Sequence, residues 1–361
     1  MKKIFYFTWL ISFLFALFVL LGASFKEAGR IFLYQEYPEG FAAGDLFDFS
    51  LLEDFKGKFR LIKGETNGQL ETADVITFGD SFFDCDSDSP LFAKELEERL
   101  GLPIYNRSTL MHTDVDVDVN PMAFLKSMNY RKGKRRILIL EHVERHSMVN
   151  IFALDSSPME DVDKEDEILT FHSLNDWVVK HLIVLNNGNK DFDYYFRRNI
   201  LTYPLTKWIA NFRFKFLGEF DSNIGNYSLS HRMLFYSGDL GFNYAHKSER
   251  ILDLMATILS EFSQKLKQAY NIDLVYVVIP NKYSIYNDFV RPYFYDNYIT
   301  QISEKLRAKG VPFIDLYSVY MNYRSTDDSR LLYFPSDTHF TPFGKGLLVE
   351  AAIKELKNLG N

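Results

Sequence analysis

The hydrophobic positions of the chain fall into one long apolar run near its start and a series of shorter runs with strand or helix period. Three short runs, ADVITF, LPIYNRS and RRILILE, begin at Ala73, Leu102 and Arg135 and are rich in aliphatic residues. Two amphipathic stretches separate them, and Asn120 and Pro121 supply a cap and a first helical position for the second. The pattern predicts strand, helix, strand, helix, strand, which is typical of βαβ units with a parallel sheet.

The same alternation returns after an interruption. A long amphipathic stretch from Ser248 to Tyr270 predicts a helix, and the apolar run IDLVYVVIP predicts the buried strand that follows it. A helix at YITQISEKLRAKG, a strand at VPFIDL and a closing helix at FGKGLLVEAAIKELKN complete the series. We therefore expect one α/β domain over residues 73–361, interrupted at about residues 150–247 by a mostly helical insertion.

The long apolar run extends from Ile4 to Ala23 without a charge. As a helix it would be about 30 Å long, which matches the hydrocarbon core of a bilayer. A cleaved signal peptide has a shorter apolar region, so we favour an uncleaved single-pass anchor, with Lys2 and Lys3 in the cytoplasm, and keep a signal peptide as the alternative. The expected organisation is an anchor at 1–30 with the membrane span at 4–23, a juxtamembrane segment at 31–72, and a domain at 73–361 in the periplasm or outside the cell.

Composition narrows the class of partner. The chain has 361 residues, of which 47% are hydrophobic and 16% aromatic, and it carries a formal charge of -7. An acidic balance argues against a nucleic-acid partner, because phosphate binding needs a basic face. Cys85 is the single cysteine, so no disulfide can form within the chain.

The insertion contains one unusual stretch. FDYYFRRNILTYPLTKWIANFRFKFLGEF interleaves aromatic rings with five cations. Such a stretch is typical of a polysaccharide groove or of a segment that lies on a membrane surface. Helices that pack over the sheet with solvated cations are the alternative, and we favour that simpler interpretation.

Candidate chemistry lies where predicted strands end. Ser81, in GDSFF, follows the run ADVITF and precedes a helix, so its hydroxyl is expected on an exposed strand-to-helix turn. Asp337 and His339 lie two residues apart in the loop YFPSDTHFTPFG. A serine needs a base to take its proton, and an imidazole base needs a carboxylate to set its tautomer. The three residues together predict a Ser-His-Asp site.

The remaining polar clusters have simpler interpretations. His112, His142 and His146 follow strand ends without an aspartate at comparable spacing, so we interpret them as loop or supporting residues. The acidic runs DCDSDS and DVDVDVN lack the glycine and distal glutamate of a calcium-binding loop. We therefore expect neither a metal nor a cofactor.

Four blocks resemble the SGNH hydrolase superfamily, and in particular its alginate-type O-acetyltransferase branch. They are GDS at Ser81, the segment ILILEHVERHS, IPNKYSIY, and DTHFTPFG, which is similar to the DTHW-type block of that branch. In the alginate proteins the Asp-x-His block precedes the serine, whereas here the serine comes first, so alginate is not the expected substrate. The resemblance implies a flavodoxin-like, three-layer α/β/α fold. It also implies oxyanion or substrate contacts at Gly79, Asp80, Asn106, Arg145, Lys282 and Tyr286.

Within those blocks several roles stay open. Asn106, or a backbone N–H near Arg107 and Ser108, would serve the oxyanion hole, because the usual glycine is missing. Arg145 would bind the oxyanion or a substrate carboxylate, or pair with Glu144. Lys282 and Tyr286 would contact substrate or support the site.

The implied activity is acyl transfer, with acetyl as the expected group, from an acyl-serine at Ser81 to hydroxyls of a cell-surface or secreted polysaccharide. The resemblance further implies that a membrane-bound O-acyltransferase supplies the acyl group at the inner or cytoplasmic membrane. An esterase acting on the same glycans and a non-catalytic glycan-binding or assembly protein are the alternatives. The first shares the triad, and the second would be expected to lack it.

Overall fold

A computed structural model describes residues 2–24, 31–34, 41–61, 66–84, 89–108, 120–155, 195–245, 247–291 and 294–360. Two compact units make up the chain. The first, here the anchor unit, comprises Met1–Glu39, Ser50–Asp54 and Asp161–Asp221. The second, here the sheet unit, comprises Gly40–Phe49, Phe55–Glu160 and Ser222–Asn361.

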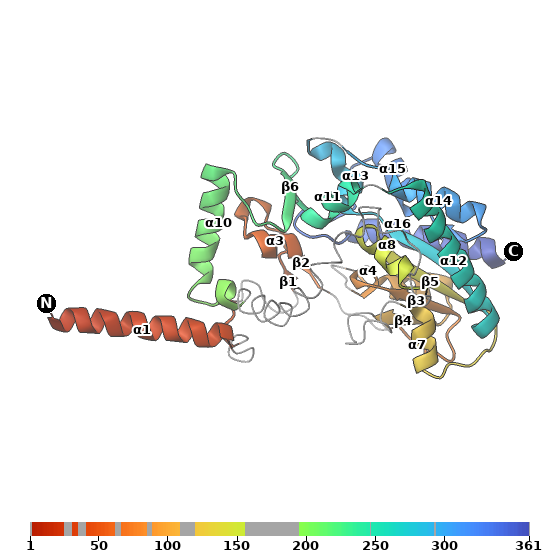
Figure 1. Cartoon of the computed structure of the whole chain (residues 1–361), viewed down its shortest axis with the longest axis horizontal. Coiled ribbons are helices and arrows are strands. Elements are labelled where there is room, and N and C mark those ends of the chain that lie inside the picture. The colour runs from red at the N-terminus through yellow and green to blue at the C-terminus, as the bar shows by residue number, and fades with distance from the viewer. Residues whose placement is uncertain are drawn as a thin grey trace. The chain divides into compact units, whose positions relative to one another are not determined.

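A five-stranded parallel sheet forms the centre of the sheet unit, with the strand order β4-β3-β5-β8-β9 (Figure 1). The order is doubly wound, because the chain leaves β3 toward β4 and then crosses to β5 on the other side. Ligand sites in such sheets lie beyond the carboxyl ends of the strands, at the point where the order reverses, which here is between β3 and β5. The strands are β3 (Val75–Gly79), β4 (Ile104–Ser108), β5 (Arg136–Val143), β8 (Ile272–Ile279) and β9 (Phe313–Ile314).

Helices cover both faces of the sheet, which explains why its central strands are hydrophobic without alternation. In β8, Val275 and Val277 pack on one side and Leu274 and Val278 on the other, and all four are buried. One layer contains α4 (Ser81–Asp84), α5 (Phe92–Leu100), α15 (Leu316–Thr326) and α16 (Pro342–Gly360). The other contains α7 (Pro121–Ser127), α8 (Glu144–Phe152), α12 (Glu249–Tyr270) and α14 (Tyr298–Ala308). The predicted three-layer α/β/α fold is confirmed.

Two predicted helix starts are confirmed in detail. The side chain of Asn120 accepts hydrogen bonds from the backbone N–H groups of Met122 and Ala123 at the start of α7. The side chain of Ser248 accepts one from Ile251 at the start of α12. Helix α15, between β9 and the loop that carries His339, was not among the predicted elements.

The sheet unit also includes segments outside the predicted domain core. Residues 55–72, expected to be juxtamembrane, and residues 222–247, expected to belong to the insertion, are both parts of this unit. Residues 55–72 contribute β2 (Phe59–Arg60), which forms a hairpin with β1 (Phe41–Ala42), and residues 222–247 contribute the hairpin of β6 (Ile224–Ser228) and β7 (Met233–Tyr236) and α11 (Ser237–Tyr244). Between β1 and β2 lie α3 (Asp45–Ser50) and the 3₁₀ turn Glu53–Phe55, of which Ser50–Asp54 belong to the anchor unit. After β8 come α13 (Lys282–Tyr286) and the 3₁₀ turn Asn287–Phe289.

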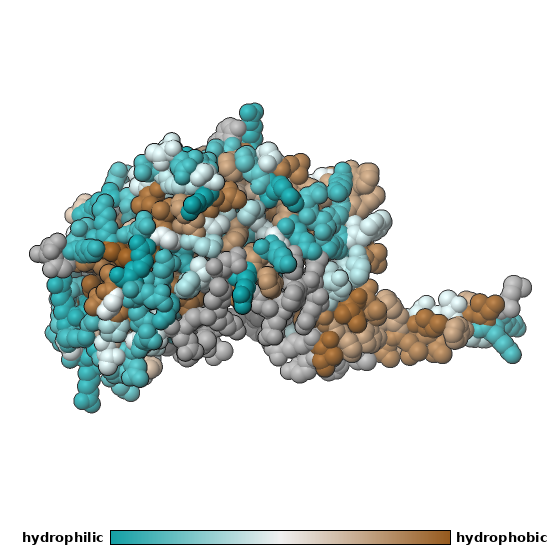
Figure 2. All heavy atoms as spheres, turned by 180° about the vertical axis from the view of Figure 1, so that it is seen from behind, coloured by the Kyte–Doolittle hydropathy of each residue, from teal (hydrophilic) through white to brown (hydrophobic). Residues whose placement is uncertain are grey.

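Helices α1 (Lys2–Ser24) and α10 (Tyr203–Leu217) belong to the anchor unit. Helix α1 is long and apolar enough to cross a membrane, and on the face shown in Figure 2 its surface is hydrophobic along most of its length. This length and composition fit a single-pass anchor or a signal sequence. The acidic run MEDVDKEDE of the insertion lies outside the described residues.

Candidate active site

The turn after β3 places Ser81 at the first position of α4. Gly79, the last residue of β3, has to be glycine, because an added Cβ would lie 2.5 Å from Glu141 Oε2 and 2.9 Å from a ring carbon of Phe83. The next N–H, of Asp80, donates to Glu141 Oε2 at 2.8 Å, and Asp80 Oδ1 accepts from Phe82 N at 3.0 Å. Gly79 and Asp80 therefore shape the turn that presents Ser81, through a buried glutamate on the neighbouring strand.

The predicted loop brings His339 and Asp337 to the serine. His339 Nε2 lies 2.8 Å from Ser81 Oγ, and His339 Nδ1 lies 2.6 Å from Asp337 Oδ1. Asp337 Oδ1 also accepts the backbone N–H of His339 at 2.8 Å. Because the carboxylate can only accept, Nδ1 carries the proton and Nε2 is left to accept from the serine hydroxyl. The arrangement has the geometry of a Ser-His-Asp triad.

A second carboxylate supports this loop from outside the predicted blocks. The backbone N–H of Asp45, at the start of α3, donates to Asp337 Oδ2 at 2.8 Å. In return Asp45 Oδ1 accepts the backbone N–H of Thr338 at 2.8 Å, and its other oxygen accepts the Thr338 hydroxyl. The side chains of Asp45, Asp337 and His339 bring ligand-type atoms within 4.8 Å of one another, so they are the described group that could hold a metal ion.

Lys282 binds the backbone of the triad loop through its ammonium group. Its Nζ donates to the backbone oxygens of Phe334, Pro335 and Asp337 at 3.1, 3.2 and 2.7 Å. The side chain is almost completely buried. Tyr286, one turn further along α13, accepts the backbone N–H of Leu332 on its hydroxyl at 2.7 Å. Both residues thus bind the backbone around the triad loop, as the supporting alternative expected.

Burial and charge set the protonation of the site. Burial alone would raise the pKa of Asp337, but the imidazole of His339 and the converging hydrogen bonds hold this pKa at about 2. For His339, burial lowers the pKa, and the attraction of Asp337 more than offsets this, so the pKa lies above its usual value. Burial and the charge of Asp337 raise the pKa of Asp45. Burial lowers the pKa of Lys282 to about 8.

The raised pKa of His339 predicts the pH dependence of acylation. A protonated imidazole cannot take the proton of Ser81, so kcat/KM for an acyl ester should fall as the pH drops through the pKa of His339. Because that pKa is raised, the midpoint of the fall is expected above about 6.5, the ordinary histidine value. A pH profile of kcat/KM measures it, and a midpoint below the ordinary value would contradict this electrostatic account.

Two other predicted contact residues, Arg145 and Asn106, bind groups outside the triad loop. Arg145, at the start of α8, pairs with buried Asp239 at 3.1 Å and lies 5.4 Å from the ring centre of Tyr236, so its partner is not Glu144. Asn106 accepts the hydroxyl of Thr77 at 2.6 Å across β3 and β4. The loop after β4, residues 109–119, lies outside the described residues, and the prediction of an oxyanion donor near Asn106 stays a prediction.

Of the other histidines, His142 is buried with its Nδ1 3.1 Å from the hydroxyl of Tyr276, and burial with the nearby His146 lowers its pKa to about 3. His112, Cys85 and most of both acidic runs lie outside the described residues. Asp45 and Glu141, which position the site, and Asp239, the partner of Arg145, were not singled out from the sequence. Glu141 is the last residue of the predicted strand RRILILE. Its position at a strand end was the sequence signal that could have marked it as a site residue.

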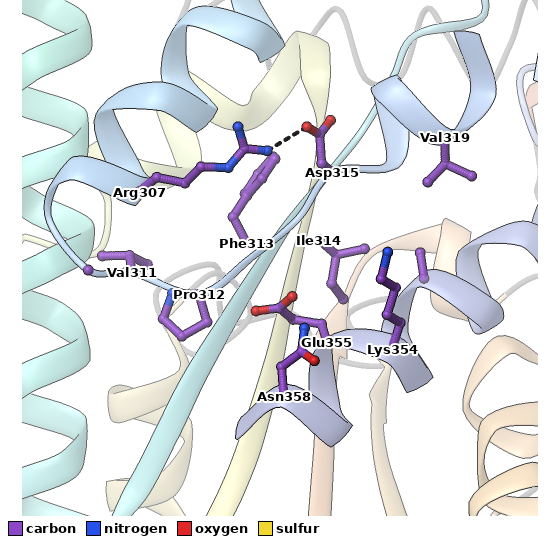
Figure 3. Close-up of a pocket in the computed structure, with 12 residues that line it drawn as sticks. Arg307, Val311, Pro312, Phe313, Ile314, Asp315, Val319, Lys354, Glu355 and Asn358 are labelled. Carbon is purple, nitrogen blue, oxygen red and sulfur yellow. Dashed lines mark hydrogen bonds and ion pairs between the residues drawn. The ribbon is translucent and has the colours of Figure 1, made fainter. Parts of the chain in front are cut away.

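An open cavity lies elsewhere in the sheet unit. Its volume is about 510 Å³, and it is lined by the segment before β9, by β9 itself and by α16. Figure 3 shows Arg307 and Asp315 paired at its rim, 2.6 Å apart. None of the triad residues lines this cavity.

Comparison with known families identifies the C-terminal part of the chain. Residues 233–359 match the family model of the SGNH hydrolase-like domain of the acetyltransferase AlgX. The matched region includes Lys282, Tyr286, Asp337 and His339, and Ser81 lies outside it. No curated protein and no solved structure gives a significant match. Together with the parallel sheet and its order, the match shows an SGNH-like α/β domain whose residues 233–359 are similar to the SGNH hydrolase-like domain of the acetyltransferase AlgX.

Proposed function

We propose that this protein is an O-acyltransferase, with acetyl as its expected acyl group, that modifies hydroxyls of a cell-surface or secreted polysaccharide. The observation that carries the proposal is the chain of hydrogen bonds from Ser81 through His339 to Asp337, in a domain of the acetyltransferase type. A domain that only bound glycan would have no need of a base held 2.8 Å from a serine hydroxyl.

The proposed reaction has two halves. Ser81 Oγ attacks the acyl carbonyl of the donor while His339 Nε2 takes the serine proton, and His339 then gives this proton to the leaving group. In the second half a sugar hydroxyl loses its proton to His339 and attacks the acyl-serine carbonyl. The Ser81–acyl bond breaks, the serine regains a proton from His339, and the acetylated sugar departs. Asp337 stabilises the imidazolium that forms in each half.

The acyl donor is proposed to come from a membrane-bound O-acyltransferase that carries the group across the bilayer. The proposed location is the extracytoplasmic side of the cell membrane, in the periplasm or outside the cell. Support comes from α1, whose length and apolar surface fit a single-pass anchor. An anchored enzyme would stay next to such a partner, whereas a released one would have to find it by diffusion.

The decisive experiment separates transfer from hydrolysis. The full chain in detergent is incubated with an activated acetyl ester and followed by intact mass, where acylation adds about 42 Da. An adduct on the wild type that is absent from Ser81→Ala would place the acyl group on this serine. Addition of oligosaccharides should then move the acetyl group to sugar hydroxyls faster than acetate is released.

The other outcomes are equally clear. Release of acetate without transfer to any oligosaccharide would favour the esterase, which shares the triad and uses water as the final acceptor. A folded wild-type protein that forms no adduct and turns over no ester would favour a glycan-binding protein. Either result would overturn the proposed transferase.

A further inference from the structure

Helix α10 of the anchor unit exposes its apolar side. Positions three and four residues apart share a face of a helix, and by this spacing Leu205, Trp208, Ile209, Phe212 and Phe216 form a stripe along α10. All five are exposed, Trp208 by 63% and Phe216 by 73%. An ordinary surface helix turns such a stripe toward the core. The stripe of α10 would therefore be more stable in contact with an apolar environment outside the anchor unit than in water.

Contacts on the opposite side fix this orientation. Asn211 donates to the backbone oxygen of Leu51 at 2.8 Å and accepts the N–H of Glu53 at 3.0 Å. Lys207 pairs with Glu53, and Phe214 is buried. Since the polar residues of α10 already bind the rest of the unit, rotating the helix to bury the stripe would break these bonds.

Cations border the stripe. Helix α10 contains Lys207, Arg213 and Lys215 and no acidic residue. At about 100° per residue, Arg213 and Lys215 lie roughly 80° to either side of the stripe. Arg213 pairs with Glu219 at 2.7 Å and Lys215 lies 3.9 Å from Asp54, and all of these side chains are about half exposed. Such exposed pairs contribute little free energy, so long basic side chains at the edges of the apolar face can reach lipid phosphates while the face enters the hydrocarbon boundary. The distribution is that of an interfacial helix.

Contacts within the anchor unit connect α10 to α1. Phe32, eight residues beyond Ser24, the last residue of α1, packs its ring against Phe18 of that helix, with ring centres 4.3 Å apart. The backbone oxygen of Phe32 accepts the N–H of Ile200 at 2.9 Å, and Tyr34 N donates to Arg198 O at 2.7 Å. α10 begins three residues after Ile200, and in Figure 1 it runs across the direction of α1. A helix so placed lies along a membrane that α1 crosses.

We propose that α10 lies in the headgroup–acyl boundary of the phospholipid membrane that holds α1, with its stripe toward the acyl chains. The proposal rests on the proposed membrane anchor and does not depend on the chemistry of the triad. It gives the anchor unit a second membrane contact, which would restrict tilting and rotation about α1. A glycan on the stripe is the competing occupant, because Trp208 also lines a cavity of about 390 Å³ with Tyr34 and Tyr203.

Tryptophan quenching in membranes tests the proposal. The chain has three tryptophans, Trp9, Trp177 and Trp208. A full chain with Trp9→Phe and Trp177→Phe, in vesicles of phosphatidylcholine and phosphatidylglycerol, reports on Trp208 alone. Phospholipids brominated near the headgroup should quench its emission strongly, and those brominated near the methyl end should quench it less. Aqueous iodide should quench it little.

Matched variants and a second reporter complete the test. In the same background, Leu205→Glu should reduce the bromolipid quenching, whereas Leu229→Glu, an equally exposed leucine of the sheet unit, should not. A chain that keeps only Trp9 reports whether α1 is inserted. Quenching of Trp9 without quenching of Trp208 would overturn the interfacial helix and leave the anchor in place. Strong iodide quenching of Trp208 that oligosaccharide relieves would favour the glycan, and shielding from both quenchers would show that protein covers the stripe.

Discussion

Replacing Asp337 by Asn is expected to lower the rate of Ser81 acylation by about 10⁴-fold while the protein stays folded. Asp337 accepts three hydrogen bonds, from His339 Nδ1, His339 N and Asp45 N. An amide has one oxygen to accept with, so its NH₂ group must face one of these donors. The expected result is an imidazole in the wrong tautomer, with its proton on the nitrogen that faces Ser81.

Single-turnover acylation with an activated acetyl ester, followed by intact mass, measures this loss. Because the amide carries no charge, the pKa of His339 should also fall, and the midpoint of the pH profile should move to lower pH. Asp288→Asn is the matched control, since Asp288 is an exposed partner of Arg324 away from the triad, and it should leave the rate within about twofold. A loss of less than tenfold for Asp337→Asn would contradict the assigned role.

The chemistry at the strand ends could be predicted because it depends on short local patterns. Ser81 follows a clear strand, and Asp337 and His339 share one loop. A two-residue spacing within a loop already places the carboxylate beside the imidazole. Ser81 and His339 are 258 positions apart in the sequence. The parallel sheet brings them together, because the carboxyl ends of its strands all lie at one edge.

The supports of the loop could not be predicted in the same way. Asp45 lies 292 positions from Asp337, in a stretch with few periodic signals, and their contact exists only because the folded chain brings α3 to the loop. The order of the strands in the sheet could not be predicted either, because the same alternation of strands and helices along the chain is compatible with several orders. Helix α15 was missed because its sequence, LYSVYMNYRST, has little apolar periodicity, and its buried residues are Leu316 and Tyr320.

The outward face of α10 shows a different limit of sequence reasoning. Its aromatic and basic residues were evident, and the favoured interpretation was a helix packed over the sheet with solvated cations. The structure instead assigns α10 to the anchor unit, with Asn211 and Lys207 turned inward and the apolar stripe exposed. The spacing of hydrophobic residues predicts that one face of the helix is shielded from water. Whether protein or lipid shields this face depends on the elements around the helix.

Replacing Lys282 by Met is expected to destabilise the protein and to slow acylation together. Three buried backbone oxygens, of Phe334, Pro335 and Asp337, would each lose the hydrogen bond from the lysine, and a bond from a charged donor contributes about 1.5–3 kcal/mol. The oxygens of Phe334 and Pro335 keep the backbone donors Asp337 N and Leu234 N. Against this, a pKa lowered to about 8 means that the charged lysine itself costs roughly 3 kcal/mol below that pH, which methionine would regain. The lost hydrogen bonds outweigh this gain, so we expect the free energy of unfolding to fall by about 3 kcal/mol.

The same variant should change how stability depends on pH. Because the pKa of Lys282 is lowered on folding, the unfolded chain binds more protons between about pH 8 and pH 10.5, and this lysine makes stability rise with pH across that window. Lys282→Met should remove that contribution, while Lys309→Met, at an exposed position, should keep it and change stability by less than about 0.5 kcal/mol. Denaturant unfolding of the full chain in detergent at several pH values measures both.

The loss of acylation follows from the position of the loop. Lys282 holds the backbone on both sides of Ser336, and a displacement of about 1 Å in a catalytic group can cost roughly 10²-fold in rate. We therefore expect the acylation rate of Lys282→Met to fall about 10²-fold under conditions where the variant is folded. Unchanged acylation in a destabilised variant would show that the lysine supports the fold but does not position the triad.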